Sequence, residues 1–292
     1  MSTFSTCTSS TRPGSPANGD VLFETDTKNV ILWDGTNWQI YNNDGSNTPT
    51  FPNVYSAELA DGVDDRVAYN STSGNQTSLG AFTGDMSFVL WFKQNSSPKT
   101  YEVIISSHNH LTSYDGVQGK FDMDIQSGGT LRIFSRDSGA GGFNDLSAGS
   151  VVNNSWNFIA QVFDSSASAH YTYIGQSSTS PTLKNTISSS QTLEDFANGF
   201  KLGDGNQPNL SGYVDDFAIF NGKALSSSEI TTIWNNGASF DYSSDATLNP
   251  VGWYRMGDDN SGTGTAIQNK VNTGSSYDAS LQNGASFSTT IY

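Results

Sequence analysis

The chain has 292 residues, enough for one large β domain and a small additional unit. Its formal net charge of −15 comes from 28 acidic and 13 basic residues. This balance opposes binding to nucleic acid and to anionic membranes, since both depend on Lys and Arg. It is compatible with divalent cations, although the simpler interpretation is that acidity keeps the protein in solution. Charged residues make up only 14 % of the chain, and Gly, Ser, Thr and Asn replace them, as in proteins with many turns between short strands.

Residues 1–18 are polar and contain Pro13 and Pro16, which predicts an extended arm. They carry neither the basic nor the apolar segment of a secretion signal, so we expect no signal peptide. No run approaches the roughly 18 apolar residues of a membrane-spanning helix, so no membrane insertion is predicted. Cys7 is the only cysteine, which excludes an internal disulfide. An incidental thiol is the simpler interpretation, and a cross-link between two chains is the alternative.

Residues 19–42 predict a small three-strand meander, with strands at 20–24, 30–33 and 38–41. Alternate residues of a strand point to opposite sides, and both sides of this meander are apolar. Three isolated strands are marginal in water. We therefore expect one face to be buried against a partner chain, with packing onto the rest of the chain as the alternative. The apolar side chains concerned are Val21, Phe23, Ile31, Trp33, Trp38 and Ile40.

Residues 43–52 are rich in Asn, Ser, Thr and Pro and are predicted to form a linker. Beyond them, short apolar or alternating runs recur between turn residues. These runs lie at 63–69, 86–93, 101–106, 119–126, 130–135, 155–164, 170–175, 199–203, 213–220 and 251–256. Many strands with almost no helix predict a two-sheet antiparallel sandwich, in which 251–256 closes beside the opening strand.

A single short helix is predicted after the strand at 213–220. Ser226 followed by Glu229 forms a capping box, which marks the beginning of the helix. Gly237 suits the left-handed position just beyond its end. The apolar face of this helix consists of Ile230, Ile233 and Trp234.

Residues 212–237 resemble the closing segment of the laminin-G-like, concanavalin A-like jelly-roll domains, which often reads G-x-[IV]-D-[DE]-x-x-[IV]-[FY]-x-x-x-L-[ST]-x-x-E-I. Segments 60–67, 86–92 and 155–160 resemble further strands of the same superfamily. The resemblance covers 55–292 and implies an all-β jelly-roll sandwich with one short helix as a domain at 51–292. Because this fold serves lectins, adhesion modules, glycosidases and virus structural proteins, it implies little about function. The residues that match the closing segment are Gly212, Val214, Asp215, Asp216, Ile219, Phe220, Leu225, Ser226, Glu229 and Ile230.

The meander is similar to short segments that recur in bacteriophage tail fibres and other virion appendages. These commonly read G-D-[LV]-[WYF]-x-[DE]-T and, after a gap, [WY]-D-G-[ST]-x-W. In phage proteins such modules join an attachment region to a distal domain, which implies that residues 1–50 serve in virion attachment or oligomerisation. The matching residues are Pro16, Gly19, Asp20, Val21, Phe23, Glu24, Thr25, Trp33, Asp34, Gly35, Thr36 and Trp38.

The strand at 119–126 carries Asp122, Asp124 and Gln126 on one face. Glycosidases of the resembled fold carry E-x-D-x-x-E or E-x-D-x-E on a strand, and retaining hydrolysis needs two carboxyl groups about 5–5.5 Å apart. Gln126 cannot donate or accept a catalytic proton at the last position. An outward polar strand face is the simpler interpretation, and no catalytic residue is predicted.

Metal sites are suggested by two patterns. His108 and His110, with His170 as the only other histidine, lack the further ligands of a transition-metal site. The resembled family often binds one Ca²⁺, so the resemblance implies a structural Ca²⁺, for which the sequence assigns no ligands. Turn formation and backbone capping are the alternative roles of the same carboxylates. The oxygen ligands that suit Ca²⁺ are Asp61, Asp64, Asp65, Asp204, Asp215, Asp216, Asp258 and Asp259.

Glycan binding is open from the sequence, because lectins of this fold place aromatic and polar groups on loops at one rim of the sandwich. Most aromatic residues are nevertheless expected in the core. The glycine-rich segments 139–142 and 203–205 lie between strands and are predicted to be turns, not phosphate sites. The aromatic candidates for a glycan site are Tyr114, Phe143, Tyr171 and Tyr173.

These patterns together predict a non-enzymatic virion structural protein of a tailed bacteriophage: a head decoration, fibre or tail appendage. Residues 1–50 would contact other virion proteins, and the jelly roll would bind host-surface glycan or reinforce the shell. Fibre-type appendages are often trimeric, so a homotrimer is expected. The alternatives are a free bacterial glycan-binding lectin module and a jelly-roll glycoside hydrolase.

Overall fold

The computed structural model divides the chain into two compact units, Met1–Pro52 and Asn53–Tyr292. Among the residues described, no helix is long and apolar enough to cross a membrane. The structure describes residues 5–25, 30–33, 35–41, 53–60, 63–69, 79–80, 84–95, 99, 101–107, 120–126, 128–136, 143–145, 148–188, 199–204, 208–272 and 277–292.

The first unit is a small sheet with the strand order β1-β2-β3-β4. The three strands of the predicted meander are present and pair antiparallel. β1 lies within the predicted arm and pairs parallel to β2, so the sheet has one strand more than expected. The strands are β1 (Ser5–Cys7), β2 (Val21–Glu24), β3 (Val30–Trp33) and β4 (Trp38–Tyr41).

The two faces of this small sheet differ in burial. Leu22 lies opposite Ile31, and both side chains are buried. On the same face Glu24 is fully buried and pairs with Arg12 at 2.5 Å between Oε1 and Nε. The opposite face remains partly open, and Val21 is 39 % exposed there. Its other apolar side chains are the half-buried Phe23, Val30 and Leu32.

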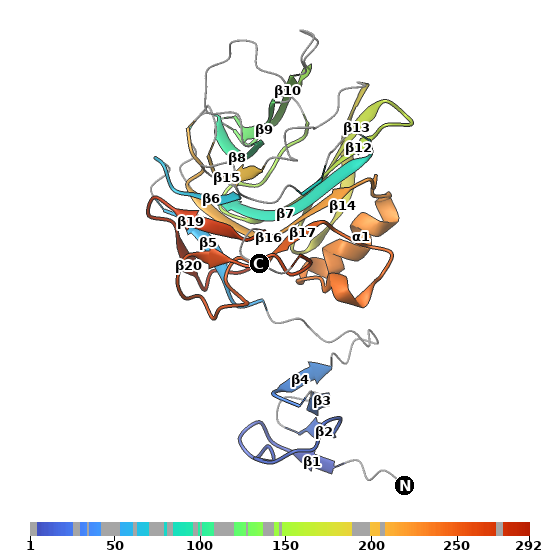
Figure 1. Cartoon of the computed structure of the whole chain (residues 1–292), viewed down its shortest axis with the longest axis vertical. Coiled ribbons are helices and arrows are strands. Elements are labelled where there is room, and N and C mark those ends of the chain that lie inside the picture. Colours follow the sequence, from blue (N-terminus) through green and yellow to red (C-terminus); the bar gives the residue numbers. More distant parts are fainter. Residues whose placement is uncertain are drawn as a thin grey trace. The chain divides into compact units, whose positions relative to one another are not determined.

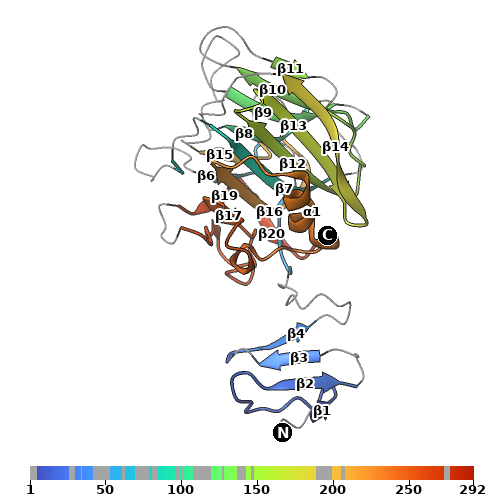
Figure 2. The ribbon, with the colours of Figure 1, turned by 90° about the vertical axis from the view of Figure 1, so that its right-hand side faces the viewer.

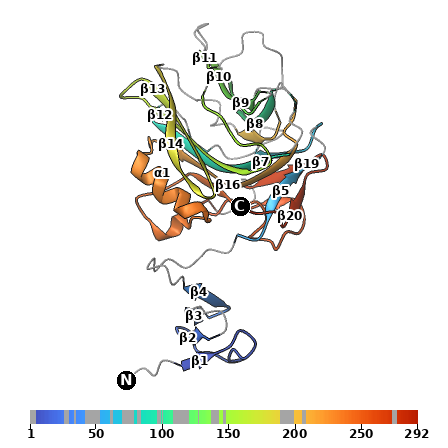
Figure 3. The same ribbon diagram turned by 180° about the vertical axis from the view of Figure 1, so that it is seen from behind.

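The second unit is a sandwich of two sheets that face each other, as the opposed views of Figures 1 and 3 show. We call one of them the front sheet; it has the order β11-β10-β9-β8-β15-β6-β19-β18. The back sheet has the order β14-β13-β12-β7-β16-β5-β20, with β17 paired to β16. All pairings of named strands within both sheets are antiparallel, so the predicted two-sheet jelly roll is confirmed.

The strands of the front sheet are β6 (Arg66–Tyr69), β8 (Glu102–Ser107), β9 (Lys120–Ile125), β10 (Leu131–Arg136), β11 (Phe143–Asp145), β15 (Phe200–Leu202), β18 (Ala266–Ile267) and β19 (Ala279–Gln282). Those of the back sheet are β5 (Ser56–Leu59), β7 (Met86–Gln94), β12 (Trp156–Asp164), β13 (Ala169–Gln176), β14 (Thr179–Ser188), β16 (Gly212–Asn221), β17 (Gly252–Tyr254) and β20 (Ser286–Ser288).

The closure of the sandwich differs from the prediction. β17, within the run at 251–256, pairs with β16 and not with the opening strand. Instead β5 pairs with β20 and β6 pairs with β19. Strands of three or four residues near the C-terminus complete both sheets, and such short, partly polar segments carry little periodicity to identify them.

The core lies between the two sheets and is rich in aromatic rings. Phe88 meets Phe121 across the sheets with ring centroids 5.7 Å apart, and Phe200 meets Phe217 at 4.6 Å. Tyr69 stacks on Phe200 at 5.6 Å. Edge-to-face and offset rings contribute beyond their buried area, typically about 0.5–1.5 kcal/mol per pair.

The centre of the back sheet is buried on both faces, because α1 (Ser227–Trp234) lies on its outer side (Figure 2). Val89 and Trp91 point outward from β7 and are nevertheless buried. Ile230 and Ile233 are buried on the helix, and Trp234 Nε1 donates to the Gln176 carbonyl at 2.8 Å.

Both caps of this helix are resolved in detail. The predicted capping box is confirmed, since Ser226 and Glu229 bind each other's backbone N–H. The left-handed residue at the end of the helix is Asn235, with φ of 48°, two residues before the predicted Gly237. Gly237 follows with φ of 79° and lies so close to the Ser177 carbonyl that no Cβ would fit.

Candidate functional site

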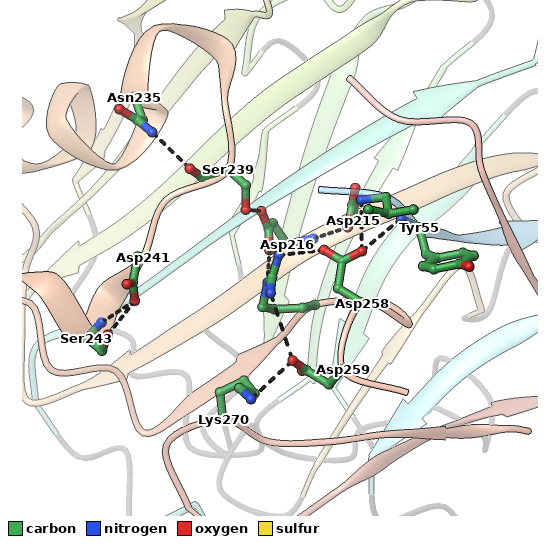
Figure 4. A network of polar contacts seen from close by, with 12 residues as sticks. Tyr55, Asp215, Asp216, Asn235, Ser239, Asp241, Ser243, Asp258, Asp259 and Lys270 are labelled. Atoms are coloured by element: carbon green, nitrogen blue, oxygen red, sulfur yellow. Dashed lines mark hydrogen bonds and ion pairs between the residues drawn. The ribbon is translucent and has the colours of Figure 1, made fainter. Parts of the chain in front are cut away.

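Carboxylates that the sequence nominated for Ca²⁺ gather at one place, beside the outer face of the back sheet. Asp215 and Asp216 occupy a bulge of β16, where the register against β7 shifts. Asp216 has a φ of 40°, and its backbone N–H donates to Asp215 Oδ1 at 2.8 Å. Figure 4 shows Asp215, Asp216 and Asp258 close together, although the chain separates Asp258 from the other two by some forty residues. The bulge thus turns two successive carboxyls toward a distant turn.

Arg255 contacts two of these carboxyls, those of Asp216 and Asp258. We call Asp215, Asp216, Arg255 and Asp258 the Arg255 cluster. The guanidinium donates to Asp258 Oδ2 at 2.6 Å and lies 4.0 Å from Asp216 Oδ1. It also lies over the Trp253 ring, 5.8 Å from its centroid. Its side chain is only 4 % exposed. A buried cation of this kind is stable only while its carboxylate partners remain in place.

The cluster forms hydrogen bonds with residues at both ends of the sandwich. Asp258 Oδ1 accepts the backbone N–H groups of Val54 and Tyr55 at 2.9 and 2.8 Å, where the sandwich begins. Asp216 Oδ2 accepts the hydroxyl of Tyr292 at 2.5 Å and the hydroxyl of Ser239. Tyr292, the last residue, stacks on Trp91 with centroids 4.0 Å apart. The carboxyls of Asp258 and Asp216 therefore accept backbone N–H groups where the sandwich begins and the hydroxyl of its last residue, Tyr292.

Burial shifts the ionisation of these groups. Burial raises the pKa of Asp215 well above its ordinary value, and the charges of Asp216 and Asp258 add to this effect. Burial also raises the pKa of Asp258 to about 6, although Arg255 and the N–H groups of residues 54 and 55 oppose the shift. Asp215 and Asp258 lie in a dry, negatively charged place, so burial and neighbouring carboxylates favour their protonated forms.

The candidate Ca²⁺ carboxylates do not form a recognisable metal site among the residues that the structure describes. In the described part of the chain, no three His, Cys, Asp or Glu residues are arranged to hold a metal ion. Asp204 accepts from Arg66 at 2.9 Å and Lys201 at 3.3 Å, and Asp65 accepts the Ala60 N–H at 2.9 Å. Asp259 pairs with Lys270 at 3.1 Å, Asp64 is exposed, and Asp61 lies outside the described residues. Ca²⁺ therefore stays a prediction without assigned ligands.

Asp122 and Asp124 share the outer face of β9, as the alternation predicted, but both are buried and not solvated. Arg132 of the neighbouring β10 donates to both carboxylate oxygens of Asp124, with Nε at 2.9 Å from Oδ1. Burial raises the pKa of Asp124, and Arg132 counteracts this shift. A carboxylate held on both oxygens by a guanidinium is a structural acceptor. This arrangement gives no support to a role in proton transfer.

The remaining candidates divide between described and undescribed parts of the chain. His108, His110, Tyr114 and the glycines at 139–142 lie outside the described residues, as does the side chain of Phe143. His170 is buried in the sandwich against Phe163, with centroids 4.6 Å apart. Gly203 has a φ of 84° in a bend directly after β15, and Gly205 lies outside the described residues. Tyr171 and Tyr173 are half-buried on β13 and remain candidates.

A pocket of about 170 Å³ lies between the short 3₁₀ turn η4 (Tyr242–Ser244) and β17. Its floor includes the rings of Tyr242 and Trp253, and Lys270 stands at its side. Both rings are almost fully buried, so they offer little surface to a ligand. The volume is below the roughly 300–1,000 Å³ of typical ligand pockets.

Sequence reasoning missed the residues that organise the cluster. Arg255 and Tyr292 carry no local motif, because their partners lie far away in the chain. The same holds for Arg132, whose pairing with Asp124 depends on strand register. Lys201 is another buried cation, between two apolar residues of β15. A lysine in such an apolar strand indicates a buried acidic partner, so this residue could have been noticed in the sequence.

Comparison with known proteins gives one family match and several similar folds. The sequence profile of the concanavalin A-like lectin/glucanases superfamily (Laminin_G_3) matches residues 61–231. No curated protein sequence matches the chain. A Bacteroides ovatus protein, provisionally described as carbohydrate binding, superposes with a TM-score of 0.56 at 11 % identity, over 94 % of this chain and 70 % of that chain.

Two further solved structures resemble part of the chain less closely. Domain 4 of AbnA, a GH43 extracellular arabinanase from Geobacillus stearothermophilus, in complex with arabinotriose, has a TM-score of 0.42 at 20 % identity and covers 61 % of this chain and 75 % of that chain. The CBM40 of the Ruminococcus gnavus IT-sialidase, bound to α2,3-sialyllactose, has a TM-score of 0.41 at 12 % identity, with 58 % and 97 % covered. At such identities the likeness concerns the fold alone.

Proposed function

Since the chain belongs to the concanavalin A-like lectin/glucanases superfamily, we propose that its sandwich unit is a non-enzymatic glycan-binding module carried on the particle of a tailed bacteriophage. Residues 1–50 attach the chain to other virion proteins. The sandwich then contacts glycan on the host surface. The copy number per appendage is three, as is common for fibre-type appendages.

The observation that carries the attachment role is the open apolar face of the first unit. Leu22 and Ile31 are buried within this small sheet, whereas Val21 on the other face is 39 % exposed beside Phe23 and Leu32. A small sheet with one face still partly open gains stability when a partner covers that face. The resemblance of the same segment to virion appendage modules supports a virion protein as the partner.

Two observations support binding without catalysis. Asp124, the acid closest to a glycosidase motif, has both carboxylate oxygens bound by Arg132. Gln126 stands where a second catalytic acid would be needed. The sandwich has the fold of a lectin-like superfamily, which is compatible with glycan adhesion.

The attachment role is tested by comparing the full chain with residues 53–292. Phage particles are purified from the lysate in which the protein is produced, and the copies of the protein that they carry are removed with mild denaturant. The full chain and residues 53–292 are then added separately to these particles. We expect only the full chain to co-sediment with the particles. Binding of residues 53–292 alone would overturn attachment through the first unit.

The same preparation separates the alternatives. Absence of the protein from the washed particles by mass spectrometry, together with glycan binding by the free chain, would support a free bacterial lectin module. Hydrolysis of an oligosaccharide that disappears in Asp124→Asn would overturn the non-enzymatic assignment.

A further inference from the structure

The outer face of β13 carries two tyrosines that the core does not use. Ile174 belongs to the core, and His170 and Thr172 on the same side of the strand are fully buried. Tyr171 and Tyr173 alternate with them and therefore point outward, where each is half-buried. Burial raises the pKa of Tyr173, and the neighbouring Tyr171 adds to the shift.

The neighbouring strands complete a surface around these rings. Tyr173 lies opposite Leu183 of β14, and Tyr171 lies opposite Thr186. Leu183 is 48 % exposed and Thr186 is exposed as well. We call Tyr171, Tyr173, Leu183 and Thr186 the tyrosine face. Figure 2 shows β13 and β14 in the back sheet, with α1 on the outer side of that sheet.

The tyrosine face lies in a stretch without negative charge. Residues 165–193 contain no Asp or Glu, although the chain has 28 of them. The only basic residues in this stretch are Lys184 and the buried His170. Although the protein is strongly acidic, the segment that carries the tyrosine face thus lacks acidic residues and is rich in hydroxyl groups. Such a face can accept an uncharged polymer. It carries too little positive charge to attract a polyanion.

Building on the proposed glycan-binding function, we propose that the tyrosine face is the glycan-binding surface and that its ligand is a neutral oligosaccharide. A sugar ring lays its apolar C–H face on the two tyrosine rings, while its hydroxyls exchange hydrogen bonds with the tyrosine hydroxyls and with Thr186.

A second copy of this chain is the competing occupant, since β14 is an edge strand. Its edge is poorly suited to pairing with another strand. Pro181 lies within it, the register shifts twice along its pairing with β13, and Lys184 is exposed. Proline, irregular register and lysine are the features by which natural edge strands avoid pairing.

The experiment uses the full chain on a printed array of neutral oligosaccharides built from hexoses, pentoses and N-acetylhexosamines, with sialylated and uronic-acid counterparts. The variants are Tyr171→Ser, Tyr173→Ser and their combination. Val271→Ser is the matched control, because Val271 is an exposed apolar residue outside the tyrosine face. Thermal unfolding verifies that each variant is folded, and Tyr171→Phe with Tyr173→Phe serves as the milder pair.

We expect binding to one or more neutral glycans, at least about tenfold weaker in each serine variant and unchanged in Val271→Ser. The phenylalanine pair should retain stacking and lose part of the affinity. Neutral-glycan binding that survives both serine substitutions would overturn the site while leaving the proposed function intact. Binding to no glycan would overturn both, and binding only to acidic glycans would overturn the ligand class. Dissociation of an oligomer in the serine variants would identify a second copy as the occupant.

Discussion

Arg255 is a buried side chain that holds other buried polar groups in place. Its guanidinium holds Asp258 at 2.6 Å, and Asp258 in turn holds the N–H groups of residues 54 and 55. Removing a buried charge leaves its partners buried and uncompensated, which costs far more than the loss of an exposed ion pair. The cluster is therefore a structural junction between segments that are distant in the chain.

We expect Arg255→Met to lower the free energy of unfolding by about 3–5 kcal/mol, because Asp216 and Asp258 lose their buried cation. Lys223→Met is the matched control. Its ion pair with Glu229 spans 2.7 Å, but both side chains are 28 % exposed, so a change of about 0–1 kcal/mol is expected. Urea unfolding at pH 7 measures both. Equal effects of the two substitutions would show that the cluster does not have this structural role.

The Arg255 cluster also predicts a pH dependence of stability. The pKa of Asp258 is about 6 in the folded chain and about 3.9 when unfolded, so the folded state binds this proton more tightly. Its contribution to stability is fully present below the unfolded pKa and is lost as the pH rises through 6. From pH 7.5 down to pH 5, Asp258 should therefore add about 1 kcal/mol to the stability.

Other groups titrate in the same range, so the measurement is a difference between proteins. We compare unfolding free energies of the wild type and Asp258→Asn at pH 5 and 7.5. Asparagine keeps an acceptor for residues 54 and 55 and cannot titrate. The wild type should gain more stability on acidification than the variant. The opposite order would mean that the ionised form is the one that the fold favours.

At the scale of elements, α1 is the clearest case of local sequence determining local structure. Ser226 caps the first turn and Glu229 returns the hydrogen bond, while three apolar side chains face the sheet. The helix in turn buries Val89 and Trp91, so β7 is apolar on both faces and reads as a continuous hydrophobic run. β14 is the opposite case, since its ten mostly polar residues form a long strand without a clear alternation of burial.

The capping box gives the next prediction. Ser226→Ala removes the acceptor for the Glu229 N–H and should lower the free energy of unfolding by about 1 kcal/mol. Ser227→Ala, one residue further on and exposed, should change it by less than about 0.5 kcal/mol. Chemical unfolding of the two variants side by side measures the difference. Indistinguishable stabilities would show that the cap contributes little once the helix is packed.

At the scale of the whole molecule, the chain consists of two compact units of unequal size. The sandwich carries its own aromatic core and fastens its own ends. The first unit has a small buried interior and an apolar face that is partly open. These properties support the proposed assembly through the first unit and the proposed ligand contact through the second.

We therefore expect the full chain to be a trimer in solution and residues 53–292 to be a monomer. Phe23→Ser should weaken assembly, because Phe23 lies on the open face of the first unit. Leu183→Ser, which changes an exposed apolar residue of the sandwich, should leave it unchanged. Light scattering coupled to size-exclusion chromatography measures the mass. A trimer formed by residues 53–292 would move the assembly surface to the sandwich.

The sequence by itself determined the class of fold, the position of the helix with its N-cap, and the alternation that puts Asp122 and Asp124 on one strand face. Those features depend on neighbours within a few residues, so local patterns suffice to identify them. Only the tertiary structure decided which strands close the sandwich, that Asp124 is bound by Arg132, and that Arg255 joins Asp216 and Asp258 to both ends of the unit. The physical reason is that charge pairing and strand register depend on residues far apart in the chain, whose encounter no local pattern records.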